Sequence, residues 1–468
     1  MKPIHALAAV PLLIVLSTFS AGAEIRTHAA PPGEPLSTEF TVAVGNEEVP
    51  VYIAKVAPSD RVLRFKSVDD VSNSGKYSDT ASFATFDMEG TIEVTVRCAE
   101  TVKTAKLLPS SRGITPVISS NRVSFTLTMP ELLTLEINGD WVHSLHLFAN
   151  PFETNVIKGE APDVIYFGPG IHEIDRLRVP SGKTVYLSDG AIVRCKPAGK
   201  YGAVMALAGN NITLRGRGIL DGSLCPIHTY HLLAIQGSNI VVEGIILRDS
   251  STWNVPMRQS ENVKIRNVKI LGHRANSDGI DICNSRNVEV ADCFLRTLDD
   301  LVVVKTDSHQ GPAANVMVEN CVLWNEVAHA LSLGAELREP VDNVIFRNCD
   351  VIHDKGREWT LRVFHCDAAF ISNVTFENIR IEETKNLMSL WIGKYVWTRD
   401  PERGHIRNVV FKDIQAVGEE PRIVFQGFDA QHQVENVQLE NVTINGKPVG
   451  PADVKQNDFV QNVSVKGK

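Results

Sequence analysis

The segment Asn315-Val-Met-Val-Glu-Asn-Cys-Val-Leu323 decides the fold, because its pattern returns along the second half of the chain. An asparagine is followed by apolar residues at the second, fourth, seventh and ninth positions. Copies begin at Asn239, Asn262, Asn287, Asn315, Asn343, Asn373, Asn408 and Asn436, with a partial copy at Asn211 and a truncated one at Asn462. The intervals from Asn211 to Asn436 are 28, 23, 25, 28, 28, 30, 35 and 28 residues, and a period of this length is typical of a solenoid.

Each copy is too small to fold alone. It holds two short strands separated by a bend, with alternate side chains facing inward, and only stacking against its neighbours buries that face. The pattern therefore predicts an all-β protein in which residues 156–468 form a right-handed parallel β-helix, with the asparagines stacked at one turn. A β-propeller is the structural alternative, but its blades usually need about 40 to 50 residues.

The repeat also accounts for part of the cysteine content. Of the eight cysteines, Cys293, Cys321 and Cys349 occupy the seventh position, which otherwise holds Ile or Val. We expect them to be buried as small apolar residues, and not to bind metal, because no histidine lies at ligand spacing. The others leave one disulfide open as a possibility: Cys98, Cys195, Cys225, Cys283 and Cys366.

The chain before the repeat divides into three parts. Residues 1–23 have one early lysine, an apolar run from Ala6 to Phe19 and the end Ser20-Ala-Gly-Ala23, which predict a signal peptide rather than a membrane anchor. Residues 24–35 are rich in proline and predict a linker. From 36 to 155, alternating apolar runs such as Phe40-Thr-Val-Ala-Val44 predict a small antiparallel β-sandwich. We therefore expect a secreted or periplasmic protein.

The overall composition excludes two classes of partner. The chain has 468 residues, 43% of them hydrophobic, and a formal net charge of −8, so nothing predicts the basic stripe of a nucleic-acid-binding protein. After residue 23, no stretch has the roughly 18 apolar residues of a membrane span. The sequence leaves the oligomeric state open.

Chemistry-bearing residues gather in the middle of the repeat. They lie in three segments: Ala275-Asn-Ser-Asp-Gly-Ile-Asp281, Thr297-Leu-Asp-Asp300 and Ala328-His-Ala-Leu-Ser-Leu-Gly334. The segments are about one solenoid turn apart, which predicts that Asp278, Asp299, Asp300 and His329 share one patch. Crowded carboxylates raise at least one pKa, as a general acid requires. Solvated turns and a Ca²⁺ site are the alternatives for such aspartates.

These segments carry a family resemblance. Asn276-Ser-Asp-Gly-Ile-Asp281, Asp299-Asp300 and His329-x-x-Ser332-x-Gly334 resemble glycoside hydrolase family 28, the polygalacturonases, over roughly residues 160–445. Gly216-Arg-Gly-Ile-Leu-Asp-Gly222, Trp253 and Lys305 agree with it. A β-sandwich before a β-helix with three aspartates is also similar to family 49, the dextranase-like enzymes.

The resemblance implies a role for each catalytic residue. Asp299 would be the general acid, Asp278 and Asp300 would activate water with inversion at the anomeric carbon, and His329 would tune the proton of the acid. Carboxylates on adjacent rungs could also lie close enough for the short separation that is usual in retaining enzymes, so spacing alone leaves retention of the anomeric configuration open.

The resemblance and the loops suggest residues that bind substrate. Asn276 and Trp253 would contact the sugar. Lys305 and Arg362 would contact substrate oxygens or a carboxylate, although as isolated charges they could equally be structural partners. Trp391 lies in the longest interval, 35 residues, where a binding loop is expected, and its ring would stack on a sugar face or pack the loop. We expect a polysaccharide or oligosaccharide partner, no cofactor and no metal.

Two departures put a uronic acid substrate in doubt. Ala328 and Ala330 replace the glycines beside the family histidine, and Arg362-Val-Phe364 keeps the arginine but not the lysine of the family's Arg-x-Lys. The leading hypothesis is a secreted, inverting glycoside hydrolase acting on a pectic polysaccharide. A dextranase-like or other neutral or algal glycan hydrolase, a polysaccharide lyase or epimerase, and a non-catalytic carbohydrate-binding β-helix remain the alternatives.

Overall fold

The computed structural model describes residues 23–58, 78–196, 199 and 201–467. All but the last residue of the predicted signal peptide, 1–23, lies outside the described residues. Among the residues that are described, no helix has the length and apolar character needed to cross a membrane.

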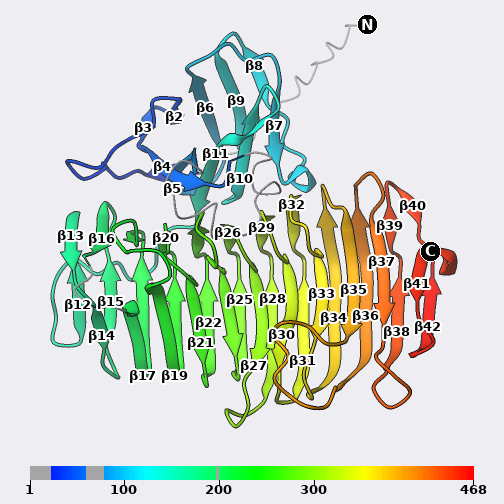
Figure 1. Ribbon diagram of the computed structural model, residues 1–468. Helices are drawn as coiled ribbons and strands as arrows, with labels where there is room; N and C mark the ends of the chain where they lie inside the picture. The colour runs from blue at the N-terminus through cyan, green and yellow to red at the C-terminus, as the bar shows by residue number, and fades with distance from the viewer. Residues whose placement is uncertain (1–22, 59–77, 197–198, 200, 468) are drawn as a thin grey trace, which may run out of the picture.

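Residues 164–466 form a single sheet of 31 strands wound into a helix of stacked rungs (Figure 1). Between the end rungs, the strands pair in parallel with strands one rung before and one rung after, and β39 (Thr443–Ile444) and β40 (Lys447–Pro448) pair antiparallel near the C-terminal end. The parallel β-helix predicted from the repeat is therefore confirmed.

The rungs present three faces, each a column of strands. The ladder column begins each repeat and contains β22 (Glu261–Arg266), β25 (Arg286–Ala291), β28 (Ala313–Glu319), β31 (Val341–Arg347), β34 (Phe370–Ile381), β36 (His405–Ala416), β38 (Val434–Glu440) and β42 (Val460–Lys466). The docking column contains β16 (Ala191–Cys195), β18 (Ile219–Asp221), β20 (Ile246–Arg248), β23 (Lys269–Leu271), β26 (Phe294–Thr297), β29 (Val322–Asn325) and β32 (Asp350–Asp354). The site column contains β21 (Val255–Arg258), β24 (Ile280–Cys283), β27 (Val302–Thr306), β30 (Leu331–Leu337), β33 (Leu361–His365), β35 (Asn386–Ile392) and β37 (Arg422–Gln426).

The repeat asparagines form a ladder along one edge of the helix. Asn315 has a φ of 54°, in the left-handed region that asparagine tolerates well. Its side-chain amide donates to Asn287 Oδ1 at 3.0 Å, and Asn343 donates to Asn315 Oδ1 at 2.9 Å. The asparagine thus turns the chain into the next strand and satisfies its neighbour's polar group.

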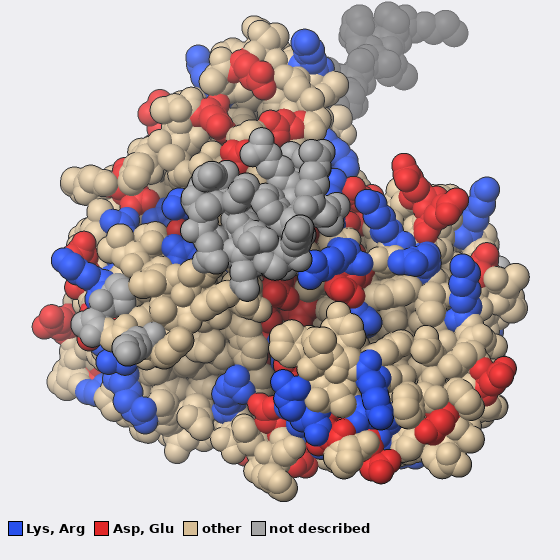
Figure 2. Space-filling model, in the orientation of Figure 1, with Lys and Arg blue, Asp and Glu red and all other residues tan. Residues whose placement is uncertain are grey.

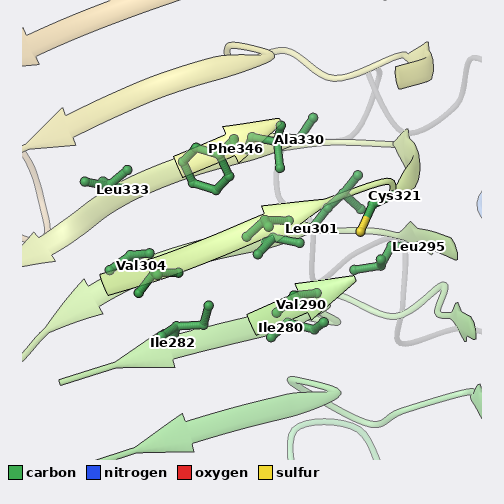
Figure 3. Close-up of a cluster of buried hydrophobic side chains, with 14 of the residues drawn as sticks. Ile280, Ile282, Val290, Leu295, Leu301, Val304, Cys321, Ala330, Leu333 and Phe346 are labelled. Atoms are coloured by element: carbon green, nitrogen blue, oxygen red, sulfur yellow. The ribbon is translucent and has the colours of Figure 1, made fainter. Parts of the chain in front are cut away.

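The interior of the helix is filled by the apolar positions of the repeat. Figure 3 shows Cys321 in this interior with Leu295 and Leu301. Cys293, Cys321 and Cys349 are fully buried there, as their column predicts. All eight cysteines are free and buried, so the disulfide that the sequence left open is not formed.

The residues before the helix form two sheets. One contains β1 (Glu24–Arg26), β4 (Val51–Val56), β5 (Asp79–Glu89), β7 (Ala105–Leu108), β10 (Leu132–Ile137) and β11 (Asp140–Asn150). The other contains β2 (Phe40–Val44), β3 (Glu47–Val49), β6 (Ile92–Cys98), β8 (Val117–Ser119) and β9 (Arg122–Leu127). The sheets enclose a common apolar core. Their pairs are antiparallel except β5 with β11, which run parallel.

The predicted linker, residues 24–35, is in fact built into the structure. Glu24–Arg26 pairs with β5, and Ile25 packs against the core of the two sheets. Glu34 is buried and accepts hydrogen bonds from Arg194 at 2.9 Å and Arg248 at 2.8 Å. The local composition of residues 24–35 could not predict these contacts, because the partners of Glu34 lie 160 and 214 residues away along the chain.

The N-terminal sheets dock on the docking column of the helix, as Figure 1 shows. Trp324 of β29 is fully buried at this junction. The Arg296 guanidinium stacks on its ring at 3.7 Å and donates to Glu326 at 3.0 Å. Apolar packing and a buried ion pair across the junction, between Arg217 and Asp87 of β5 at 2.7 Å, therefore tie the two parts together.

Candidate active site

One row of side chains lies just before the strands of the site column. The strands pair in a fixed register, in which Ile280 lies beside Val302 and Val302 beside Leu331. Residues two positions before these strands therefore occupy the same place in each rung and stack along the helix axis. They are Trp253, Asp278, Asp300, His329 and Trp359. Successive rungs are about 4.8 Å apart, so the row brings distant sequence segments into contact.

Three carboxylates form the centre of the row. Asp278, Asp299 and Asp300 each offer an oxygen within 4.8 Å of the others. Asp278 and Asp300 are buried, whereas Asp299 keeps some exposure to solvent. Figure 2 shows acidic atoms in a hollow near the middle of this face, with basic side chains around it.

Lys305 supplies positive charge inside this cluster. Its Nζ lies 3.2 Å from Asp278, 2.7 Å from Asp281 and 4.0 Å from Asp300. The Lys305 ammonium thus lies among the oxygens of Asp278, Asp281 and Asp300. Asp281 is a fourth carboxylate of the site. It ends the quoted motif and alternates with the inward-facing Ile280 and Ile282, so its side chain points to the site, but the sequence analysis gave it no role of its own.

The pKa values of the four carboxylates diverge. Burial and the neighbouring Asp300 raise the pKa of Asp299 to about 7. Burial and Asp281 raise the pKa of Asp278 well above its ordinary value, and burial raises that of Asp281 to about 6. Burial opposes ionisation of Asp300 too, but the His329 ring and Lys305 outweigh it and lower its pKa. The cluster therefore contains both proton carriers and an ionised carboxylate.

His329 contacts Asp300, and not the expected acid Asp299. Its Nδ1 lies 2.6 Å from Asp300 Oδ1, and its Nε2 lies 3.0 Å from Arg362 Nη1. Arg362 in turn donates to Glu358 at 2.7 Å. Glu358 was not predicted, although its spacing of four residues from Arg362 is a detectable signal.

Aromatic rings flank the carboxylates on both sides along the helix axis. Upstream, the Lys305 ammonium lies 4.2 Å from the centre of the Trp253 ring. Downstream, Phe364 packs against Trp391 at 5.2 Å and Tyr395 at 5.3 Å between ring centres. Such rings offer flat apolar surfaces on either side of the acids.

A pocket of about 280 Å³ of free volume adjoins Lys305. Trp253 and Arg258 line one side, and Trp397 and Arg399 line the other. The loop 393–404, which carries the last two, crosses in front of β30 and β31 in Figure 1. The extra residues of the longest interval thus lie beside Lys305, at the edge of the carboxylate cluster.

Asn276 is placed differently from the other predicted site residues. It is exposed, with a φ of 55°, and no hydrogen bond joins its side chain to the carboxylates within the described ranges. The structure therefore brings Asp278, Asp299, Asp300, His329, Lys305, Arg362 and Trp253 into one network, places Trp391 at its downstream edge and leaves Asn276 at the rim.

Closely spaced carboxyl groups with divergent pKa values are typical of glycosidases. The chain belongs to the glycosyl hydrolases family 28, whose model matches residues 216–466.

Two relatives found by sequence similarity are polygalacturonases. An exopolygalacturonase from Arabidopsis thaliana is 29% identical over 158 residues, 32% of this chain and 35% of its own length. A probable exopolygalacturonase B from Aspergillus fumigatus is 24% identical over 292 residues, 54% of this chain and 63% of its own length. The chain thus spans less than two thirds of these relatives.

Two solved structures share the fold. The exopolygalacturonase from Thermotoga maritima has a TM-score of 0.53 at 17% identity, covering 65% of this chain and 84% of its own. Dex49A from Penicillium minioluteum has a TM-score of 0.62 at 14% identity, covering 94% of this chain and 96% of its own. The second similarity includes the N-terminal sheets as well as the β-helix.

Proposed function

We propose that this protein is an exported glycoside hydrolase that cleaves O-glycosidic bonds in a pectic polysaccharide by inversion. The observation that carries the proposal is the pairing of Asp299, whose pKa is about 7, with the ionised Asp300 in one cluster. A glycosidase needs one carboxyl group that carries a proton and one that has lost it.

The mechanism assigns one step to each group. Asp299 donates its proton to the glycosidic oxygen as the bond to the anomeric carbon breaks. Asp300 accepts a proton from the water that attacks this carbon, and the two carboxyl groups return to their first states by exchange with solvent. Lys305 keeps Asp300 ionised by its charge, 4.0 Å away.

Asp278 takes a modified role in this proposal. The resemblance implies a second base, but burial and Asp281 favour its protonated form. We assign it to orienting the attacking water by a hydrogen bond, while Asp300 takes the proton.

Inversion rests on the family and not on the distance between the carboxylates. Inverting enzymes usually separate the two groups by about 6.5–9.5 Å, and retaining enzymes by about 5–5.5 Å. The oxygens here lie within 4.8 Å, which by itself favours retention. Proton NMR of the first-formed anomer distinguishes the two, and a retained anomer would overturn this part of the proposal.

The pectic substrate is supported by the names of the relatives, which are polygalacturonases. A neutral glycan is the second candidate, because Phe364 stands two residues after Arg362, and Arg362 already pairs with Glu358 at 2.7 Å. Trp253 and Trp391 would stack on sugar rings on either side of the cleaved bond.

Residues 1–23 are proposed to direct export, and residues 36–155 to act as a β-sandwich that covers the docking column. The catalytic part is residues 156–468, and its partner is a polysaccharide or oligosaccharide chain.

The test is a screen of polygalacturonate, rhamnogalacturonan, dextran and algal glycans for new reducing ends. Asp299→Asn serves as the inactive control. Unsaturated, ultraviolet-absorbing products would favour a lyase. Binding without cleavage of any glycan would favour a carbohydrate-binding protein, and either result would overturn the proposal.

A further inference from the structure

Arg362 lies between a catalytic histidine and a carboxylate, and this placement limits what it can do. Its Nη1 is 3.0 Å from His329 Nε2 and 2.7 Å from Glu358 Oε2. Its guanidinium also stacks on the Phe364 ring at 3.9 Å. We infer that Arg362 is a positioning residue that fixes the tautomer of His329, and that it does not bind a carboxylate of the substrate.

The direction of the hydrogen bonds determines the tautomer. A guanidinium has donors only, so His329 Nε2 must offer its lone pair to Arg362 Nη1. The ring proton is then on Nδ1, which donates to Asp300 Oδ1 at 2.6 Å. The backbone N–H of His329 also points to this oxygen, at 3.3 Å. Arg362 therefore makes His329 a neutral donor to the proposed base.

Neither edge of the Arg362 guanidinium is left for a substrate carboxylate. Bidentate binding uses two neighbouring N–H groups on one edge. On the end edge, both hydrogens of Nη1 are committed to His329 and Glu358. On the side edge, Nε is shielded from solvent and has no hydrogen-bond partner in the described part of the chain. A uronate could at most contact Nη2, which gives no planar recognition.

Glu358 holds this arrangement from outside the catalytic row. It precedes Arg362 by four residues, and its side chain remains 34% exposed, whereas that of Arg362 is 9% exposed. Its charge balances the guanidinium, so the Arg362 charge is compensated before any substrate arrives. The partners of His329 are Asp300 and Arg362. The other charged or titratable groups around them are Glu358 and Tyr395 near Arg362, and Lys305 and Asp299 near Asp300.

The catalytic consequence rests on the proposed function. Without Arg362, the His329 ring can place its proton on Nε2 or take up a second proton. Asp300 then loses a fixed donor or gains a competing acid beside it. The chemical step should suffer, while binding of the sugar chain should not.

The experiment compares Arg362→Gln with Glu358→Gln, because the buried arginine variant alone could fail to fold. Arg407→Gln is the matched control, since Arg407 stacks on Phe370 at 4.4 Å but lies outside the site. Nitrogen-15 NMR of labelled histidines reads the His329 tautomer, with His329→Gln identifying its signals. Steady-state kinetics on acidic and neutral oligosaccharides read kcat and KM separately.

We expect the wild type to show a proton on Nδ1 and a bare Nε2. In Arg362→Gln the Nε2 signal should change to a protonated form, and kcat should fall about tenfold or more on either substrate, with KM within about twofold. This follows because Asp300 loses a fixed hydrogen-bond donor to its charged form, and a tenfold fall corresponds to about 1.4 kcal/mol of transition-state stabilisation. Glu358→Gln should show a smaller change of the same sign, and the control should show none.

Two results would overturn the inference. One is a wild-type His329 that carries its proton on Nε2. The other is an Arg362→Gln variant whose KM rises only for acidic substrates while the tautomer stays unchanged. If the tautomer is as expected but the wild type cleaves no glycan, the proposed function fails and the positioning role stands.

Discussion

Replacing Lys305 by methionine should move the acid side of the pH–activity curve to higher pH. Asp300 must be ionised to accept a proton, so activity is lost as the pH falls through its pKa. Lys305 is one of the groups that lower this pKa, with its Nζ 4.0 Å from Asp300 Oδ2. Removing the cation raises the pKa of Asp300, and the loss of activity on acidification then begins earlier.

The size of the shift follows from this distance. At 4.0 Å and an effective dielectric constant of about 20, the attraction is about 4 kcal/mol. One pKa unit corresponds to about 1.4 kcal/mol, so the upper limit is about three pH units. Asp278 and Asp281 compete for the same cation, and we therefore expect a shift of about one to three units.

The assay is kcat/KM as a function of pH for the wild type and Lys305→Met, over the range where circular dichroism shows both folded. Lys412→Met is the control, because Lys412 pairs with Glu377 on the outer surface, at 2.7 Å, away from the site. A folded Lys305→Met variant with an unchanged acid limb would show that Lys305 does not control the base.

Three further predictions concern the acid and the junction between the two parts. Activity should fall as the pH rises through about 7, because Asp299 must carry its proton and its pKa is about 7; a pH–activity curve that stays flat to about pH 9 would contradict this assignment. Asp299→Asn should lower kcat by about 10²–10⁴-fold with little change in KM, and steady-state kinetics giving a wild-type kcat would exclude it as the acid. Trp324→Ala should reduce the free energy of unfolding by about 3–5 kcal/mol, because the ring is fully buried at the junction. Urea denaturation measures this, and a loss below about 1 kcal/mol would mean that the junction contributes little.

The β-helix could be predicted because its rules are local. Each repeat asparagine marks one turn, and the apolar positions that follow it fill the interior, which is why Cys321 was placed correctly from its column. The same spacing predicted that Asp278 and Asp300 lie on neighbouring rungs. Local periodicity carries this information because every rung repeats the geometry of the last.

Side-chain partners could not be predicted in the same way. The spacing gave no sign that Lys305 would enter the carboxylate cluster through Asp281, or that His329 would turn to Asp300 instead of Asp299. Rotamers decide these contacts. The integration of Glu34 was missed because Arg248 lies 214 residues away in the chain.

The most direct test of the central claim is the chemistry of the product that the wild-type protein releases from polygalacturonate. The reaction is run in water labelled with heavy oxygen, and the products are read by mass spectrometry and proton NMR. The proposal predicts saturated oligosaccharides with the label at the new reducing end and inverted anomeric configuration. Unlabelled products with a carbon–carbon double bond would contradict hydrolysis by Asp299 and Asp300.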